Sequence, residues 1–357
     1  MSEVAGRKIS AIGYGLMGKN LSSPAAQKRQ SLTVSRAGLT WREKQATDEE
    51  AIKCMETAFE NGINFWNGGE FYGPIERNSL HILNAYFTKH PEQADKVVIS
   101  IKGGAKPGMP TPDGRPENIR RSIDECLKIL DGKKFLDIFE CARVDPKVPI
   151  EESIGAIAEY VKAGKVGAIS LSECSADSIR RAAKVHKIAC VEVEVSLWAT
   201  EIFENGVAQT CAELDIPIVA YSPLGSGFLT GEIKRFDDLP EGDFRRMIPK
   251  FQPGAFEKNL DLVHQLQKIA DKKGCTPGQI AVAWVLKQAS KPGRPKLIPI
   301  PGATKPQRIV ENNVQISLSA NDEAEIQRIL DGAEIVGGRY PDMIAMYNFG
   351  DSPPLQK

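Results

Sequence analysis

Short β-branched or apolar runs alternate along the chain with longer segments in which apolar residues recur at helical spacing. The short runs predict eight strands, at residues 9–15, 63–66, 96–102, 136–141, 165–171, 191–195, 217–222 and 296–302. Helical spacing predicts helices between them, including residues 48–60, 116–130, 150–163, 175–186, 203–214 and 276–288. Thr47 and Ser175 stand where N-terminal caps belong, and Gly62 follows a predicted helix as a C-terminal glycine would. This alternation predicts an α/β fold, a (β/α)8 TIM barrel with long loops at its C-terminal face.

A doubly wound parallel sheet is the alternative fold for such an alternation. It is disfavoured because no GxGxxG follows any predicted strand, and GYGLMG after the first strand has the wrong spacing. Two segments fall outside the alternation. Residues 225–255 are rich in Gly, Pro and charge, which suits a loop over the barrel mouth, and residues 332–357 predict an irregular C-terminal tail. We therefore expect residues 1–357 to form one barrel domain.

Composition narrows the class of protein. Of 357 residues, 41% are hydrophobic and 26% are charged, as in a globular protein with a sizeable core. The 46 basic and 46 acidic side chains cancel, so no global field favours nucleic acid or an anionic membrane. No apolar run approaches the ~18 residues of a membrane span, and the N-terminus lacks a signal-peptide core. Seven singly scattered cysteines argue against disulfides and structural zinc. We expect a cytoplasmic enzyme that binds no metal and acts on a small molecule, with its oligomeric state left open.

The ends of the predicted strands carry residues suited to chemistry, and a barrel of this kind builds its active site there. Tyr72 follows the second strand and Lys102 ends the third. Together they can form a proton donor, because an ammonium group stabilises phenolate and lowers the tyrosine pKa from ~10 toward working pH. The alternative is that Tyr72 merely caps the barrel and Lys102 is a solvated strand end.

Five segments in order resemble the signatures of the aldo-keto reductases. They are INFWNGGEFYG, VVISIKGG, DIFECARVDP, AYSPLGSGFLTGE and IPIPGATKPQRIVENN, and the resemblance spans residues 9–312. It implies that Tyr72 is the proton donor, that Lys102 is its partner and that the cofactor is NADPH/NADP+. The variants GLMG…LTW, NGGEFYG and CARVDP more narrowly resemble the fungal pyridoxal reductases, which reduce pyridoxal to pyridoxine with NADPH.

Two positions of the catalytic tetrad depart from the family pattern. Asn67 stands where most members carry an aspartate, and its amide can only accept a hydrogen bond from Lys102. Ala142 stands where most carry a histidine, and it cannot donate to a substrate carbonyl. These departures bear on general aldehyde reduction more than on the fold.

Two further residues are candidates for substrate binding. Arg143, which the family commonly shares, could orient a polar substrate, or it could form an ion pair with Asp145 or Glu140. Trp41, in the LTW motif, is the second candidate.

The resemblance also assigns residues to the cofactor. Lys305 and Arg308, near the start of a helix, would hold the 2′-phosphate that distinguishes NADPH from NADH, although they could also be ordinary solvated helix charges. The remaining assignments are Glu311 and Asn312 to the adenine, Ser222, Leu224, Gly225 and Gly227 to the pyrophosphate, and Tyr221, Ser172, Glu173 and Glu192 to the nicotinamide. Glu173 and Glu192 replace the usual Asn and Gln, and a carboxylate can still accept from the carboxamide NH2.

An insertion separates GLMG from LTW, which run together in relatives. Residues 19–38 are polar and basic, lack periodicity and would sit in the first βα loop, where we expect them to be disordered. One interpretation is a lid over the cofactor. The other is a translated intron, because the junctions Gly18-Lys19 and Ala37-Gly38 can encode splice sites and the reading frame is kept. The second is favoured.

Three functions fit these observations. The leading hypothesis is an NADPH-dependent reductase of pyridoxal, in which hydride reaches the aldehyde carbon while Tyr72 protonates the oxygen. The second is a broader aldehyde or sugar reductase. The third is a nucleotide-binding regulator like the potassium-channel β subunits, which share this barrel. Tyr72 and Lys102 favour catalysis over the third.

Overall fold

The structure is a computed structural model that describes residues 2–17, 46–107 and 111–356. The predicted insertion at residues 19–38 and the candidate Trp41 lie outside the described residues.

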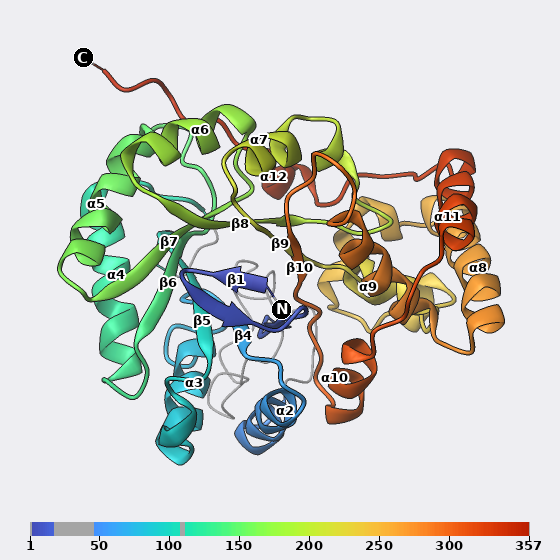
Figure 1. The fold of residues 1–357 in the computed structure, drawn as a ribbon, viewed down its shortest axis with the longest axis horizontal. Coiled ribbons are helices and arrows are strands. Elements are labelled where there is room, and N and C mark those ends of the chain that lie inside the picture. Colours follow the sequence, from blue (N-terminus) through green and yellow to red (C-terminus); the bar gives the residue numbers. More distant parts are fainter. Residues whose placement is uncertain (1, 18–45, 108–110, 357) are drawn as a thin grey trace.

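Eight parallel strands form the barrel wall (Figure 1). They are β3 (Tyr14–Gly15), β4 (Phe65–Gly69), β5 (Val98–Gly103), β6 (Leu136–Cys141), β7 (Val166–Ser172), β8 (Ile188–Glu194), β9 (Ile218–Tyr221) and β10 (Leu297–Pro299). Neighbours in sequence pair in parallel from β3 to β10. The two ends of the sheet meet in a parallel bridge between Gly15 and Gly302, supported by a hydrogen bond from the Gly13 amide to the Pro299 carbonyl of 2.9 Å. The predicted (β/α)8 fold is therefore confirmed.

Helices surround the strands, and local sequence signals set their ends. They are α2 (Asp48–Glu60), α3 (Ser79–Lys89), α4 (Pro116–Leu130), α5 (Ile150–Lys162), α6 (Ala176–Val185), α7 (Val207–Glu213), α8 (Ala255–Lys273), α9 (Pro277–Gln288), α10 (Pro306–Asn313), α11 (Ala320–Gly332) and α12 (Asp342–Ala345). Thr47 caps α2 in a capping box with Glu50, and the Ser175 side chain caps α6, as the sequence predicts. Gly62 follows α2 with a φ of 76°, a left-handed conformation that glycine adopts without strain.

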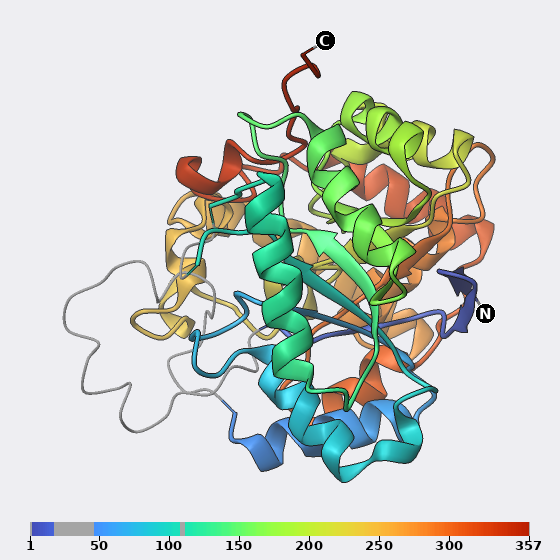
Figure 2. The same ribbon diagram turned by 90° about the vertical axis from the view of Figure 1, so that its left-hand side faces the viewer.

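The two ends of the barrel differ. At one end lies an antiparallel hairpin of β1 (Ser2–Val4) and β2 (Arg7–Ile9), so the start of the predicted strand 9–15 belongs to this hairpin instead. The reason is local: positive φ values at Ala5 and Gly6 reverse the chain. At the opposite end, the segment 225–251 runs through short 3-10 turns, η3 (Gly225–Thr230), η4 (Phe236–Asp238), η5 (Phe244–Met247) and η6 (Pro249–Phe251), and lies on the same side as α12 (Figure 2).

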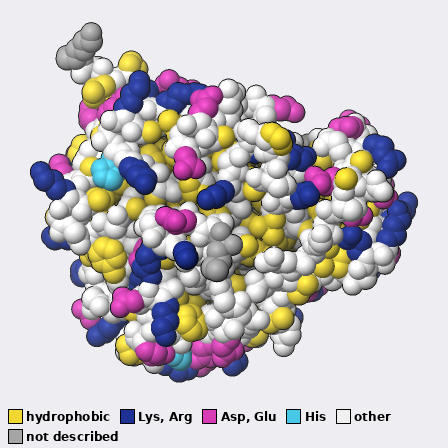
Figure 3. All heavy atoms as spheres, in the orientation of Figure 1, with side chains coloured by type: hydrophobic (Ala, Val, Ile, Leu, Met, Phe, Trp, Pro, Cys, Tyr) yellow, Lys and Arg dark blue, Asp and Glu magenta, His cyan; other side chains and the backbone are white. Residues whose placement is uncertain are grey.

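Apolar side chains fill the barrel and the layer between strands and helices. Phe65, Val98, Ile138, Val219 and Ile298 pack inside the barrel and are almost completely buried. A larger cluster joins the outer faces of the strands to the helices. On the face shown in Figure 3, basic and acidic side chains are interspersed over the surface. Among the described residues, no helix is both long and apolar enough to cross a membrane.

Candidate active site

Tyr72 is held in the loop that follows β4. Its amide donates to the Gly69 carbonyl at 3.1 Å, and its carbonyl accepts from the Ser79 amide at 3.0 Å. Gly69 lets the ring pack against the chain, because an added Cβ would lie 2.9 Å from Cδ1 of Tyr72. The Tyr72 residue is only 4% exposed. The loop therefore buries the phenol at the C-terminal end of the barrel.

Lys102 ends β5 beside this phenol. Its ammonium nitrogen lies 5.9 Å from the ring centroid of Tyr72 and 5.6 Å from that of Tyr221. Two buried carboxyl groups flank it: Glu192 forms a close ion pair and hydrogen bond, and Glu140 Oε1 lies 3.2 Å away. Burial alone would lower the pKa of Lys102, but these two glutamates hold the pKa well above its ordinary value. The structure thus brings together Tyr72 and Lys102, with the lysine charged.

The pKa of Tyr72 corrects the prediction made from the sequence. Burial raises it to about 12, and although the Lys102 charge acts in the opposite direction, Glu192 and Glu140 raise it further. The expected lowering toward working pH is therefore wrong for this structure. The physical consequence is that Tyr72 keeps its proton across the neutral range, as a proton donor must.

Asn67 forms a hydrogen bond with Glu192, a partner that the sequence did not suggest. Its Nδ2 donates to Glu192 Oε2 at 2.6 Å, and Asn67 itself is 2% exposed. The amide therefore donates to a carboxylate on β8. The sequence suggests only that it accepts a hydrogen bond from Lys102.

Glu173, which directly follows β7, is also fully buried, and it forms ion pairs with two arginines. Arg339 of the C-terminal tail donates to its two oxygens at 3.1 and 2.8 Å. The Tyr221 hydroxyl and the Glu194 amide donate to Oε1 at 2.8 and 3.0 Å. Burial would raise the pKa of Glu173, but Arg143 and Arg339 lower it to about 2. The carboxylate is thus ionised and completely surrounded by donors.

Arg143 belongs to the same network. Its Nη1 lies 3.3 Å from Glu173 Oε2 and donates to Asn348 at 3.3 Å, and its Nη2 donates to the Tyr221 hydroxyl at 3.4 Å. The suggested ion pair with Asp145 or Glu140 is therefore wrong; Glu173 is the acidic partner. Glu140 faces Lys102 instead, and Glu173 directly follows β7, the strand beside β6.

The loop after β9 turns tightly, with four residues in the left-handed region. Ser222, Gly225, Ser226 and Gly227 have φ values of 49°, 54°, 55° and 91°. Such tight turns form concavities lined by backbone amides, which bind phosphate groups. Space is limited at Gly225, where an added Cβ would lie 3.1 Å from the Trp198 ring. This loop, which includes Leu224, is the segment that we expect to bind the pyrophosphate of a dinucleotide.

The predicted 2′-phosphate residues lie at the start of α10. Lys305 is its N-cap residue and is exposed, and among the described residues it takes part in no ion pair. Arg308 pairs with Glu232 and Glu311, and Glu311 also accepts from the Thr276 hydroxyl at 3.0 Å. Asn312 is buried in the same helix, and Ser172 is buried at the end of β7. Lys305 is therefore the cation on α10 best placed to meet an anionic ligand.

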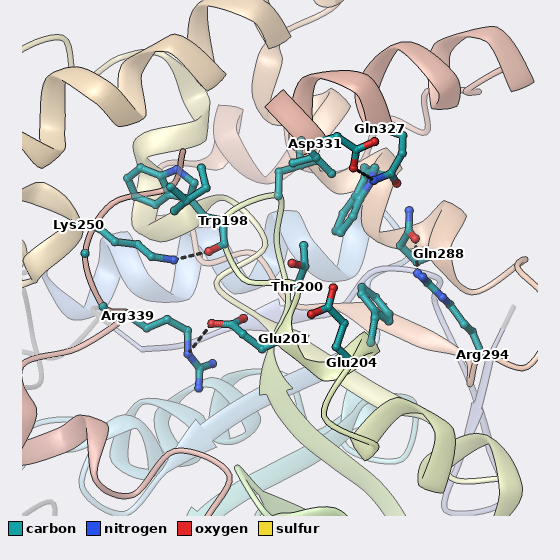
Figure 4. A pocket seen from close by; sticks show the side chains of 17 residues that line it. Trp198, Thr200, Glu201, Glu204, Lys250, Gln288, Arg294, Gln327, Asp331 and Arg339 are labelled. Atoms are coloured by element: carbon teal, nitrogen blue, oxygen red, sulfur yellow. Dashed lines mark hydrogen bonds and ion pairs between the residues drawn. The ribbon is translucent and has the colours of Figure 1, made fainter. Parts of the chain in front are cut away.

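A pocket of about 430 Å³ lies outside this constellation (Figure 4). The segment after β8, helices α9 and α11, and the tail line it, and neither Tyr72 nor Lys102 does. Figure 4 shows Lys250 directed at the Trp198 carbonyl and Arg339 at Glu201. Arg339 therefore lines this pocket and also donates to Glu173, which ties the tail to the end of β7.

Sequence reasoning missed several residues of this site. The sequence suggests Glu140 only as a partner of Arg143, and Arg339 and Tyr340 fall within the predicted irregular tail, residues 332–357. Tyr340 donates to the Tyr221 hydroxyl at 3.3 Å. The one available signal was the presence of Glu140, a second acid after Asp137, within a buried strand. A buried strand that carries an acid needs a cation nearby.

Comparisons with known proteins give the family. Residues 35–331 match the model of the Aldo/keto reductase family. The chain is 40% identical, over 95% of its length and 97% of the relative's, to "Probable pyridoxal reductase 2" of Schizosaccharomyces pombe. It is 38% identical, over 87% and 92%, to "Aldo-keto reductase yakc [NADP(+)]" of the same yeast. A solved glycerol dehydrogenase of Gluconobacter oxydans shares the fold with a TM-score of 0.75 and 23% identity, over 93% of this chain and 95% of that one.

Proposed function

Because the chain belongs to the aldo/keto reductase family, we propose that it reduces the aldehyde of pyridoxal to the alcohol pyridoxine, with NADPH as the reductant and Tyr72 as the proton donor. Membership makes the chain an oxidoreductase that uses a nicotinamide cofactor. The choice of pyridoxal rests on the name of the 40% identical relative, and the choice of NADPH on the NADP(+) in the name of another.

One observation carries the mechanism: a buried, protonated phenol lies beside a charged ammonium group at the C-terminal ends of neighbouring strands. A bound nicotinamide cofactor would supply the hydride. Tyr72 holds the proton at its hydroxyl, and the positive charge of Lys102 stabilises the phenolate that remains after the proton has moved. Since Ala142 has no donor to offer, we assign protonation of the substrate oxygen to Tyr72 alone.

The side chains around Tyr221 suit an aromatic, polar aldehyde. Arg143 lies 5.9 Å from the ring centroid of Tyr340 and keeps 17% of its side chain exposed. A ring that bears a hydroxyl group, as pyridoxal does, can stack on a tyrosine and accept from a guanidinium group. We propose that Arg143 orients the substrate in this way while Glu173 balances its charge.

The test of this function is NADPH oxidation followed by absorbance, with pyridoxal, simple aldehydes and sugars as separate substrates. We expect pyridoxal to give the highest kcat/KM. Equal turnover of simple aldehydes or sugars would indicate a broader reductase. Tight nucleotide binding without turnover of any carbonyl compound would indicate a binding subunit instead.

Lys305→Ala is expected to weaken binding of NADPH by about tenfold to a hundredfold and that of NADH by less than about threefold, because only NADPH carries the 2′-phosphate. Arg308→Ala should act in the same direction but less strongly, since Arg308 already pairs with Glu232 and Glu311. Titration of nucleotide fluorescence measures both affinities. Lys268→Ala, an exposed lysine of α8, is the control. Equal losses for the two cofactors would mean that Lys305 does not bind the phosphate.

A further inference from the structure

Two side chains from other strands position Lys102: the carboxylate of Glu192 contacts the ammonium, and the amide of Asn67 contacts that carboxylate. Glu192 on β8 uses one oxygen for the Lys102 ammonium and the other for the amide of Asn67 on β4. The side chains of Glu192 and Lys102 are 1% and 7% exposed, so both contacts are shielded from bulk water. Both oxygens of Glu192 thus accept hydrogen bonds from residues at the C-terminal end of the barrel.

Two glutamates from neighbouring parts of the barrel face the Lys102 ammonium. Lys102, Glu140 and Glu192 come from β5, β6 and β8, and Tyr72 and Tyr221 are the other titratable groups that face the ammonium. Burial and the nearby Glu192 raise the pKa of Glu140 well above its ordinary value, although Lys102 opposes this. Glu140 also receives long hydrogen bonds from Ser100 and Ser170, at 3.4 and 3.3 Å. The protonated form of Glu140 is therefore favoured by its surroundings, and Glu192 makes the closer contact with the Lys102 ammonium.

We propose that Glu192 is the positioning residue that holds the Lys102 ammonium beside Tyr72, and that Asn67 holds Glu192 in turn. Relative to most family members, the acid and the amide have exchanged strands: the family pattern has an acid at position 67 and an amide at position 192. The exchange keeps one carboxylate against the lysine and one amide against that carboxylate. This inference rests on the assignment of Tyr72 as the proton donor.

Geometry explains why Glu192 rather than Glu140 holds the lysine. Glu192 makes the closer contact, and its second oxygen is fixed by a 2.6 Å bond from Asn67. Glu140 Oε1 lies 3.2 Å from the ammonium and has no hydrogen-bond partner among the described residues. A carboxylate that is fixed at both oxygens restricts the lysine more than one that is held loosely.

A double-mutant cycle tests the exchange. Glu192→Gln should lower kcat by about 30-fold or more, with KM for the aldehyde within about threefold, because the lysine loses its fixed counter-charge. Asn67→Asp should lower kcat by about tenfold or more, because a second carboxylate would face Glu192 at 2.6 Å. The double variant restores one acid and one amide, and its kcat should recover to within about tenfold of the wild type. Such rescue would not occur if either residue served only to fill space.

Three outcomes would overturn the inference. The first is additive losses in the double variant. The second is a Glu192→Gln enzyme that binds NADPH more weakly but keeps its kcat at saturation, since that behaviour belongs to a contact with the nicotinamide. The third is a Glu140→Gln variant that loses as much kcat as Glu192→Gln. If Glu192→Gln alone does not fold, the double variant, which keeps the wild-type charge, decides: activity supports the exchange, and a folded but inactive protein refutes it.

Tyr72→Phe, assayed in parallel, separates this inference from the proposed function. If Tyr72→Phe keeps full turnover, the assignment of the proton donor fails. If Tyr72→Phe is inactive while Glu192→Gln turns over like the wild type, only the positioning role of Glu192 fails.

Discussion

Replacement of Tyr72 by phenylalanine is expected to lower kcat for aldehyde reduction by about 10²-fold or more. The variant keeps the ring that packs over Gly69 and loses only the hydroxyl, so its structure and its affinity for the nucleotide should change little. Steady-state rates at saturating NADPH, together with nucleotide binding measured by fluorescence, separate the two effects.

Tyr160→Phe is a matched control, because its hydroxyl donates to Asp124 at 2.8 Å on the outside of the barrel. It should leave kcat unchanged.

The pH profile offers a second check. Since burial raises the pKa of Tyr72 to about 12, the donor should remain protonated, and no loss of kcat that depends on Tyr72 should occur between pH 7 and 10. Wild-type turnover by Tyr72→Phe would remove the hydroxyl from the mechanism.

Glu173→Gln is expected to lower the free energy of unfolding by about 3–5 kcal/mol, because it leaves two buried guanidinium groups without their carboxylate. Arg339 and Arg143 lie 2.8 and 3.3 Å from Glu173 Oε2, and Glu173 is completely buried. Urea unfolding measures the loss. Glu159→Gln removes an exposed carboxylate that Arg120 holds at 2.9 Å, and it should cost less than about 1 kcal/mol. Equal losses in the two variants would contradict the prediction.

The same carboxylate predicts a dependence of stability on pH. The pKa of Glu173 in the folded protein is about 2, below the ordinary value of 4.5. Its stabilisation is therefore complete above about pH 5 and is lost as the pH falls toward 2. Since one pKa unit corresponds to about 1.4 kcal/mol, this contribution amounts to roughly 3 kcal/mol. The wild type should lose this amount on acidification, and Glu173→Gln should not.

The fold could be predicted from the sequence because each strand has a local signature. Apolar runs such as that of β5 are bounded by residues that end strands, and the parallel barrel then places every carboxyl end on one face. That rule was sufficient to bring Tyr72 and Lys102 together. Helix α3, whose apolar and aromatic residues are dense on several sides, was not singled out, because its helical spacing is less distinct.

The electrostatics of the site could not be predicted in the same way. The sign of the Tyr72 pKa shift depends on burial and on two glutamates from other strands, and Glu192 is 90 residues from Lys102. The acidic partner of Arg143 could not be chosen either, because it lies on the next strand of the barrel. Interactions of this kind depend on distances across the barrel mouth, which spacing along the chain does not encode.

The pairing of Glu173 with Arg339 joins residues that are made at different times. Arg339 follows Glu173 by 166 residues, so at about 5–20 residues per second a ribosome needs roughly 10–30 s to supply the cation after the anion. During that interval all of the remaining strands emerge, and the barrel can assemble around an acid whose cationic partner is Arg143, which precedes it in the chain, and which still lacks Arg339. A messenger interrupted between positions 302 and 339 would yield a protein that has every strand but lacks the two hydrogen bonds that Arg339 donates to Glu173. Such a product should be recognised as unstable by cellular quality control, whereas the completed chain is spared.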